Sequence, residues 1–479
     1  MDDLLLACHR FRHEAWLNPS QVSNLPMRDD AQSLMDLCAK VVERARKAGA
    51  DVAEASARGG WELSTKVRLG EVELVEEAGH KSLALRVLRD QRAALTSTSD
   101  LSEGGIERCI ADALMLVELS EPDPYAGPAP AELLCQPPHP ELSLYDPAVD
   151  GIDADQAIKI ATQAERAALS SDSRLSLSEG ATFSRTSSVS ALVLSSGFSA
   201  GLRGSYASLV VSPVVEDEGG KRRRGFHWTA RRHFADLDEP EAVGREAARR
   251  TLAKLGARKV PTCEAPIVFD PDVARSIIGT FAGCLVGGAL WRKSSYLVDR
   301  LGSIVASPGV TLVDDPLVPK APGSRPFDGE GLRSRRSVVV RDGKLETFLL
   351  DCYSARKLGM EPTGSGSRSG GAVGASTTNF ILQPGTRSRE DIIRETSRGL
   401  YVTEMMGFGF NALTGDYSRG ASGFWIENGE FAFPVSEITV SSNLDTMLKN
   451  IDAIGNDLDM RTATCAPTIR VSSMTIAGS

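Results

Sequence analysis

Histidine is scarce in this sequence, and its placement argues against a metal site. The chain has six histidines among 479 residues, and all of them precede residue 234. A catalytic zinc ion usually takes three histidine, cysteine or carboxylate ligands. The stretch His9–Glu14 reverses the familiar H-E-x-x-H order. Cys284, Cys352 and Cys465 are single thiols in apolar runs, which are usually core residues. We therefore expect no metal in this chain.

Paired cysteines, a secretory signal and a membrane-length apolar run are also missing. The eight cysteines lie far apart without a C-x-x-C pair, which favours free thiols in a reducing compartment. Asp2 and Asp3 precede only the short run LLLAC, whereas a signal peptide needs a basic region and a longer apolar one. The most apolar run, Ser276–Trp291, is shorter than the roughly 20 residues of a membrane helix and predicts a buried core helix. We expect a cytoplasmic protein without a membrane partner.

The charge distribution contains no long basic stripe. The chain has 54 Lys and Arg against 63 Asp and Glu, and its net charge of -9 is spread along its length. Nucleic acid is therefore not expected as a main partner. The hydrophobic share of 42% is typical of a globular protein, and 479 residues exceed what one core holds, so two or three domains are expected.

The pattern of apolar residues predicts an α+β protein, in which an N-terminal α/β region with antiparallel sheets and helices precedes a β-rich C-terminal domain. Helical spacing predicts helices over residues 31–48, 101–119, 151–172 and 239–255. Alternating runs predict the strands, and Asp342-Gly343 marks the clearest hairpin turn. The predicted units are a disordered N-terminal extension (1–30), an N-terminal α+β domain (31–120), a Pro-rich connector (121–150), a second α+β segment (151–258) and the C-terminal domain (259–479).

Three stretches that imitate catalytic motifs are better explained as turns or loops. Gly197–Gly201 matches the G-x-S-x-G nucleophile elbow, but the residues after it continue as a strand instead of a helix. A hairpin turn is therefore expected there, although a serine hydrolase using Ser199 stays a hypothesis. Gly407–Ala412 imitates a dinucleotide fingerprint but lacks the helix that would bind the pyrophosphate. Residues 363–378 are rich in Gly and Ser and predict a flexible loop.

A cluster of four polar residues, Asp416, Tyr417, Ser418 and Arg419, lies between glycines, and a strand that contains Trp425 follows it. No nucleophile with an activating base accompanies the cluster, so it predicts recognition without chemistry. The alternative is a tight turn in which Asp416 caps the backbone and Arg419 pairs within the fold. Both interpretations stay open on the sequence.

Several long runs resemble one known family, the PmbA/TldD family, and specifically its PmbA (TldE) branch. They include ALWRKSSYLVDRLG, PFDGEGLRSRRSVVVRDGKLETFLLDCYSARKLG, the long segment that starts at VTEMMGFGFNALTGDYSRG, and the ending MTIAG. The resemblance implies a cytoplasmic zinc metallopeptidase of two subunits that degrades or processes unfolded peptides. Its catalytic TldD branch carries H-E-x-x-x-H on a helix, where two histidines bind zinc and the glutamate activates water. The matching segment here, Asp272–Trp291, contains no His, Asp or Glu after Asp272.

The resemblance thus implies a non-catalytic subunit that forms a heterodimer with a TldD-like catalytic subunit, with zinc bound by that partner. Residues Asp416 to Arg419 and Trp425 would then contact the peptide or the partner. Extended peptides bind well along a strand edge, where backbone hydrogen bonds require little sequence preference. The alternative is a stand-alone peptide-binding or regulatory protein that has no cutting partner.

Overall fold

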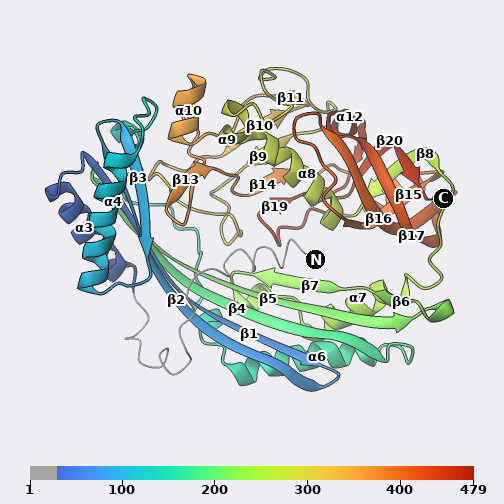
Figure 1. The fold of residues 1–479 in the computed structure, drawn as a ribbon. Coiled ribbons are helices and arrows are strands. Elements are labelled where there is room, and N and C mark those ends of the chain that lie inside the picture. Colours follow the sequence, from blue (N-terminus) through green and yellow to red (C-terminus); the bar gives the residue numbers. More distant parts are fainter. Residues whose placement is uncertain (1–29, 479) are drawn as a thin grey trace.

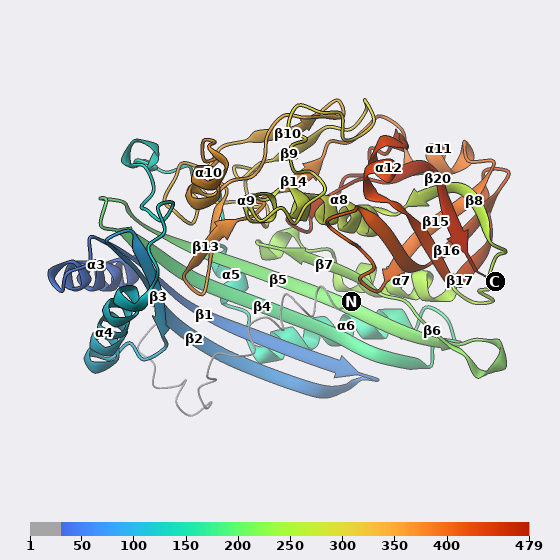
Figure 2. The same cartoon turned by 45° about the horizontal axis from the view of Figure 1, so that its top comes forward.

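The computed structural model describes residues 30–478 and confirms the α+β class (Figure 1). The predicted disordered extension lies outside the described residues except for Asp30. An N-terminal part, which is built on one long sheet, faces a C-terminal part that contains three further sheets of six, five and two strands (Figures 1 and 2). In the described part of the chain, no helix is both long and apolar enough to cross a membrane.

One seven-stranded antiparallel sheet organises the N-terminal part. Its order is β3-β2-β1-β4-β5-β6, and β7 also pairs with β5. The segments 31–120 and 151–258 both contribute strands, because β1 pairs with β4 from Glu54–Leu194 to Val67–Ala181. The strands are β1 (Val52–Arg68), β2 (Glu71–Arg89), β3 (Arg92–Thr98), β4 (Leu177–Leu194), β5 (Ser199–Glu216), β6 (Arg222–Arg224) and β7 (His227–Arg231).

Four helices cover this sheet, close to where the apolar spacing predicts them. They are α3 (Ala31–Lys47), α4 (Glu103–Leu119), α6 (Ala154–Leu169) and α7 (Pro240–Leu252). Helices α3 and α4 share a core with one end of the sheet, and α6 and α7 share a second core with the other end. Small alanines on α6 and α7 allow these two helices to approach closely, and the side chain of Asp153 caps the start of α6.

The connector between the two halves of the sheet is mostly extended, as its prolines predict. It contains the short helices η1 (Ala131–Leu133) and α5 (Pro147–Asp150). The hairpin between β4 and β5 turns at Gly197, which has φ 103°, and Ser199 is the first residue of β5. The hairpin prediction for this stretch is therefore confirmed.

The C-terminal part holds a six-stranded sheet of order β17-β16-β15-β8-β20-β18, in which β17 also pairs with β20. A five-stranded sheet has the order β11-β10-β9-β14-β19. The strands of the larger sheet are β8 (Cys263–Phe269), β15 (Arg398–Met406), β16 (Asp416–Glu427), β17 (Glu430–Asn443), β18 (Ile451–Ile454) and β20 (Ile469–Ala477). The others are β9 (Leu312–Asp314), β10 (Ser337–Arg341), β11 (Lys344–Leu345), β14 (Phe380–Leu382) and β19 (Thr464–Cys465).

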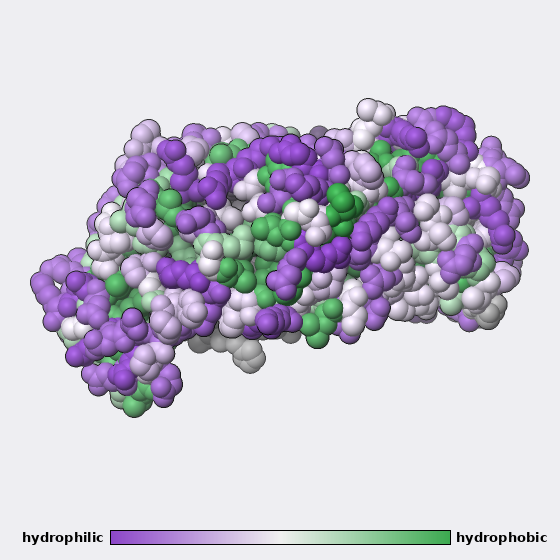
Figure 3. Space-filling view, turned by 90° about the horizontal axis from the view of Figure 1, so that it is seen from above, coloured by the Kyte–Doolittle hydropathy of each residue, from purple (hydrophilic) through white to green (hydrophobic). Residues whose placement is uncertain are grey.

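The predicted core helix is observed as two helices, α8 (Pro271–Leu285) and α9 (Gly287–Trp291), and α8 packs in the largest hydrophobic core of the chain. Three shorter helices, α10 (Cys352–Leu358), α11 (Arg389–Arg394) and α12 (Leu444–Lys449), complete this part. Seen from above, the visible face has a patch of apolar residues near its middle, and polar residues lie around and among them (Figure 3).

Residues 363–378 are not simply a flexible loop, so that prediction was wrong. They contain the hairpin β12 (Gly366–Ser369) and β13 (Ala372–Ala375). Two glycines with positive φ, Gly370 and Gly371, form its turn. A Cβ on Gly371 would lie 2.6 Å from Ala84 of β2, so this hairpin is docked against the long sheet.

Candidate functional site

Helix α8 has one buried face and one exposed stripe. Pro271 occupies its first turn, and the Asp270 carboxylate accepts a hydrogen bond from the Asp272 amide at 3.1 Å, which starts the helix. The buried face is apolar, and its members are Val273, Ala274, Ile277, Ile278, Phe281, Ala282, Cys284 and Leu285. The more accessible stripe carries Arg275, Ser276, Gly279, Thr280 and Gly283. Apart from Asp272 at its start, this stripe offers no carboxylate and no imidazole.

Asp270 caps the start of α8. Its carboxylate is 5% exposed and also accepts a hydrogen bond from the Tyr401 hydroxyl at 2.8 Å. Burial raises the pKa of Asp270, and the neighbouring Asp272 carboxylate adds to this effect. Because both oxygens already accept hydrogen bonds, the carboxyl group is a structural cap for α8.

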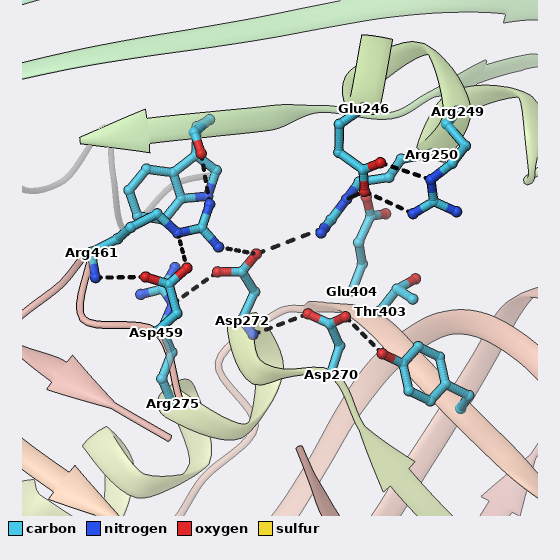
Figure 4. A network of polar contacts seen from close by, with 12 residues as sticks. Glu246, Arg249, Arg250, Asp270, Asp272, Arg275, Thr403, Glu404, Asp459 and Arg461 are labelled. Carbon is cyan, nitrogen blue, oxygen red and sulfur yellow. Dashed lines mark hydrogen bonds and ion pairs between the residues drawn. The ribbon is translucent and has the colours of Figure 1, made fainter. Parts of the chain in front are cut away.

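Three guanidinium groups surround the carboxylate of Asp272 (Figure 4). Arg275 Nε lies 3.3 Å from Oδ1, whereas Arg250 Nη1 and Arg461 Nη2 each lie 3.8 Å from Oδ2. Arginine stays charged in proteins, so three positive charges oppose the approach of a metal cation to this carboxylate. The residues at the start of α8 therefore do not fit a zinc ion.

Helix α7 adds further ion pairs to this network (Figure 4). Glu246 accepts hydrogen bonds from Arg249 at 2.7 Å and from Arg250 at 2.8 Å. Burial acts to raise the pKa of Glu246, but the two guanidinium groups outweigh it and lower that pKa to about 2. Lys254 near the end of α7 pairs with Glu404 of β15 at 2.5 Å. The Lys254–Glu404 pair joins the end of α7, which packs on the long sheet, to β15 of the C-terminal part.

The strand β7 brings an aromatic ring to the same place. Trp228 is 3% exposed, and its ring faces the guanidinium carbons of Arg461 at 4.5 Å and Arg275 at 5.7 Å. Its carbonyl oxygen accepts a hydrogen bond from Arg461 Nη1 at 2.6 Å. Burial, aided by Arg250 and Arg461, lowers the pKa of the adjacent His227 to about 4. The small pocket here is lined by Trp228, Pro271, Asp272, Arg275, Asp459, Arg461, Thr462 and Ala466.

No group of three His, Cys, Asp or Glu side chains within residues 30–478 is arranged to hold a metal ion. Burial raises the pKa of the Cys284 thiol to about 11 and that of Cys465 to about 12. The pKa of Cys352 is also raised by burial, with Glu330 contributing. These buried thiols therefore lack the lowered pKa of reactive cysteines.

The structure separates the residues of the polar cluster Asp416–Arg419 because successive side chains of β16 point to opposite faces. Tyr417 and Trp425 belong to the hydrophobic core, with 1% and 4% of their surfaces exposed. Asp416 and Ser418 are exposed, and the Asp416 carboxylate accepts a hydrogen bond from the Thr414 hydroxyl at 2.6 Å.

Arg419 is the member of the cluster that reaches α8. Its Nη1 donates a hydrogen bond to Ser276 Oγ at 3.4 Å, and its Nε is buried without an acceptor among the described residues. Arg419 therefore lies beside the accessible stripe of α8. Contact of these five predicted residues with a peptide or a partner stays a prediction.

The sequence did not single out Trp228, Asp459 and Arg461. Trp228 and Arg461 are 233 positions apart, and the folded chain alone brings them together. The residues around them in the sequence match no known motif. The one feature of the sequence that could have drawn attention to this place is the abundance of arginine around β7.

Comparisons with known proteins match most of the chain to one family. Models of the PmbA/TldA metallopeptidase family match residues 53–117 (domain 1), 147–255 (central domain) and 262–478 (C-terminal domain). The metalloprotease PmbA of Escherichia coli O157:H7 is 40% identical over 430 residues, which cover 90% of this chain and 92% of that protein.

Solved structures share the whole arrangement. A protein from Bacteroides thetaiotaomicron, named as a candidate modulator of DNA gyrase, has a TM-score of 0.87 and 27% identity over 93% of this chain and 98% of its own. TldE from Thermococcus kodakarensis has a TM-score of 0.81 over 92% of this chain and 100% of its own; at 21% identity this likeness concerns the fold alone. The chain described here therefore belongs to the PmbA/TldD family of metallopeptidases.

Proposed function

We propose that this chain is the non-catalytic subunit of a zinc-dependent peptidase of the TldD/TldE type, which acts on unfolded peptides. In this proposal it forms a heterodimer with a TldD-like subunit, and that subunit supplies the zinc ion and the catalytic glutamate. Membership of a metallopeptidase family supports the peptidase context. The proposal assigns recognition and positioning of the peptide to the chain described here.

The observation that carries the proposal is the chemistry of α8. A zinc peptidase needs about three ligands and a carboxylate within reach of the bound water. Asp272, the helix's single carboxylate, is shared by three guanidinium groups, and the accessible stripe continues with Ser276 and glycines. A water molecule beside Asp272 would meet positive charge from three arginines, and no set of three metal ligands is arranged there among the described residues.

The test compares the purified chain with the complex that it forms with a TldD-like subunit carrying H-E-x-x-x-H. Digestion of an unstructured peptide and the zinc content are measured for both. The isolated chain should cut no peptide and retain no stoichiometric zinc. The complex should cut the peptide and retain zinc. Replacement of the partner's motif glutamate should abolish cutting while the two subunits remain bound to each other.

A matched variant of this chain sharpens the result. Asp272→Asn in the complex should keep turnover within roughly tenfold, because removal of a true general base lowers the rate by about 10²–10⁴. Turnover by the isolated chain that a chelator removes would overturn the proposal. Peptide binding without any association with a TldD-like subunit would instead favour the stand-alone peptide-binding protein.

A further inference from the structure

The outer edge of strand β2 is open over much of its length. β1 pairs with β2 from end to end, whereas β3 pairs with it only over Leu83–Arg89. Residues Glu71–Gly79 therefore have β1 on one side and no strand of the described chain on the other (Figure 2). The backbone N–H and C=O groups along such an edge are available to pair with another extended chain.

The hairpin that carries this edge is held at its turn. The Glu165 carboxylate on α6 is 1% exposed, and it accepts hydrogen bonds from the backbone amides of Leu69 and Gly70, each at 2.9 Å. Arg68 Nε donates a hydrogen bond to the carbonyl oxygen of Ser178 on β4 at 3.0 Å. Because these contacts fix the hairpin to its neighbours, the edge is already extended before a ligand arrives. Binding therefore requires little ordering of this chain.

Exposed apolar side chains border the open edge. Val72, Leu74 and Val75 are 50%, 45% and 46% exposed. Leu74 and Val75 are consecutive in the strand, so their side chains lie on opposite faces of the sheet. Contacts between side chains of neighbouring strands stabilise a sheet. A chain that pairs with this edge would thus find apolar contacts on both of its faces.

Negative charge selects among the chains that could pair here. Four carboxylates accompany the edge, and they belong to Glu71, Glu73, Glu76 and Glu77. Glu73 pairs with Lys66, and Glu77 lies 3.5 Å from Arg185. The side chains of Glu71 and Glu76 form no ion pair or hydrogen bond within the described part of the chain. Like charges on paired strands are destabilising, and a second copy of β2 would bring the same carboxylates. The edge therefore favours a basic segment.

We propose that the open edge of β2, residues Glu71–Gly79, binds an extended peptide segment that carries lysine or arginine. This inference rests on the proposed function and names a class of substrate for it. The peptide backbone pairs with β2, its apolar side chains pack against Leu74 and Val75, and its basic side chains approach Glu71 and Glu76. Backbone pairing requires an unfolded, extended chain, and the carboxylates add a preference for basic sequences.

The test measures the affinity of the full chain for three capped peptides of eight residues by calorimetry. In the first peptide two lysines are placed among alternating apolar and polar residues. The second has glutamates in place of these lysines, and the third is the first with N-methyl groups on four consecutive backbone nitrogens. The first should bind about tenfold more tightly than each of the others, because charge attraction is lost in one and backbone hydrogen bonds in the other.

A double variant separates the charge from the backbone pairing. Glu71→Gln combined with Glu76→Gln should lower the preference for the lysine peptide over the glutamate peptide at least threefold, and it should leave the effect of N-methylation unchanged. The matched control is Glu43→Gln on α3, whose ion pair with Lys47 is exposed and lies off this edge. It should leave both effects unchanged. Urea unfolding checks that all variants are folded.

Equal affinity for the lysine and glutamate peptides would overturn the inference, as would tight binding of the N-methylated peptide or a preference that survives the double variant. Absence of binding by all three peptides would also overturn it. Self-association of the chain that Leu74→Lys abolishes would assign the edge to a second copy instead. Loss of lysine-peptide binding on addition of the TldD-like subunit would assign it to the subunit interface. Zinc content and the cutting of an uncharged peptide by the complex decide the proposed function separately.

Discussion

Arg368 of the hairpin β12–β13 forms an ion pair with Glu54 of β1, and both side chains are at most 5% exposed. Arg86 of β2 contacts the second oxygen of Glu54 at 2.9 Å. Burial acts to raise the pKa of Glu54, but Arg368 and Arg86 together lower it. A carboxylate between two arginines therefore joins the C-terminal part to the long sheet, where the two parts also meet through Gly371.

Glu54→Ala should lower the free energy of unfolding by roughly 3–5 kcal/mol, because it leaves the buried guanidinium group of Arg368 and the partly buried one of Arg86 without their carboxylate. Urea unfolding measures the change. The matched control is Glu43→Ala on α3, whose ion pair with Lys47 is exposed and should contribute less than about 1 kcal/mol. A loss of similar size in the two variants would show that the buried pair does not stabilise the junction.

Ser199→Ala should leave any peptidase activity of the complex unchanged, and a fluorophosphonate probe should not label Ser199. Ser199 begins β5, whereas His227 pairs with Val211, twelve residues further along that strand. At about 3.3 Å per residue these positions are roughly 40 Å apart, far beyond hydrogen-bond distance. Labelling of the wild-type chain that Ser199→Ala removes would contradict this prediction.

The sequence predicts the elements whose signals are local. Helix α3 was expected over residues 31–48 and spans Ala31–Lys47, because its apolar spacing and the Asp30 cap lie within the segment itself. The turn at Asp342-Gly343 was also evident, and both residues have the positive φ that such a tight hairpin requires.

Long-range pairing could not be predicted in the same way. The alignment of Ala57 with Ala191 joins strands separated along the chain by β2, β3, α4, the connector and α6, and alternation alone permits several registers. The pocket of Trp228, Arg275 and Arg461 has the same origin, since tertiary packing alone brings its residues together. The hairpin β12–β13 was missed because its Gly- and Ser-rich sequence has weak strand propensity and is stabilised by docking.

The stability of the chain should fall as the pH falls from about 6.5 to about 4, in part because of His227. The pKa of this buried imidazole is lowered from 6.5 to about 4 by burial, Arg250 and Arg461, with Glu246 and Asp272 opposing. In this window the unfolded chain binds a proton at His227 and the folded chain does not. The contribution lost should be about 1–3 kcal/mol.

The comparison of wild type with His227→Gln isolates the contribution of His227 to the pH dependence of stability, because carboxylates titrate alike in both proteins. Urea unfolding near pH 7 and near pH 4.5 gives the free energies of unfolding. The wild type should lose more stability than the variant between these values. Parallel pH profiles would show that His227 is not protonated preferentially in the unfolded chain.

Arg419→Ala should weaken peptide binding or subunit association while it changes the free energy of unfolding by less than about 1 kcal/mol. The side chain makes one long hydrogen bond to Ser276 and keeps a buried Nε without an acceptor among the described residues, so its removal also removes an unfavourable group. The neighbouring Tyr417→Ala is the contrasting control, because loss of a buried aromatic ring should destabilise the fold by roughly 3–5 kcal/mol. Calorimetric peptide affinity, association with the TldD-like subunit and urea unfolding are measured for both variants. If Arg419→Ala destabilises the chain as much as Tyr417→Ala and leaves binding intact, Arg419 serves the packing of β16 against α8 and the recognition interpretation fails.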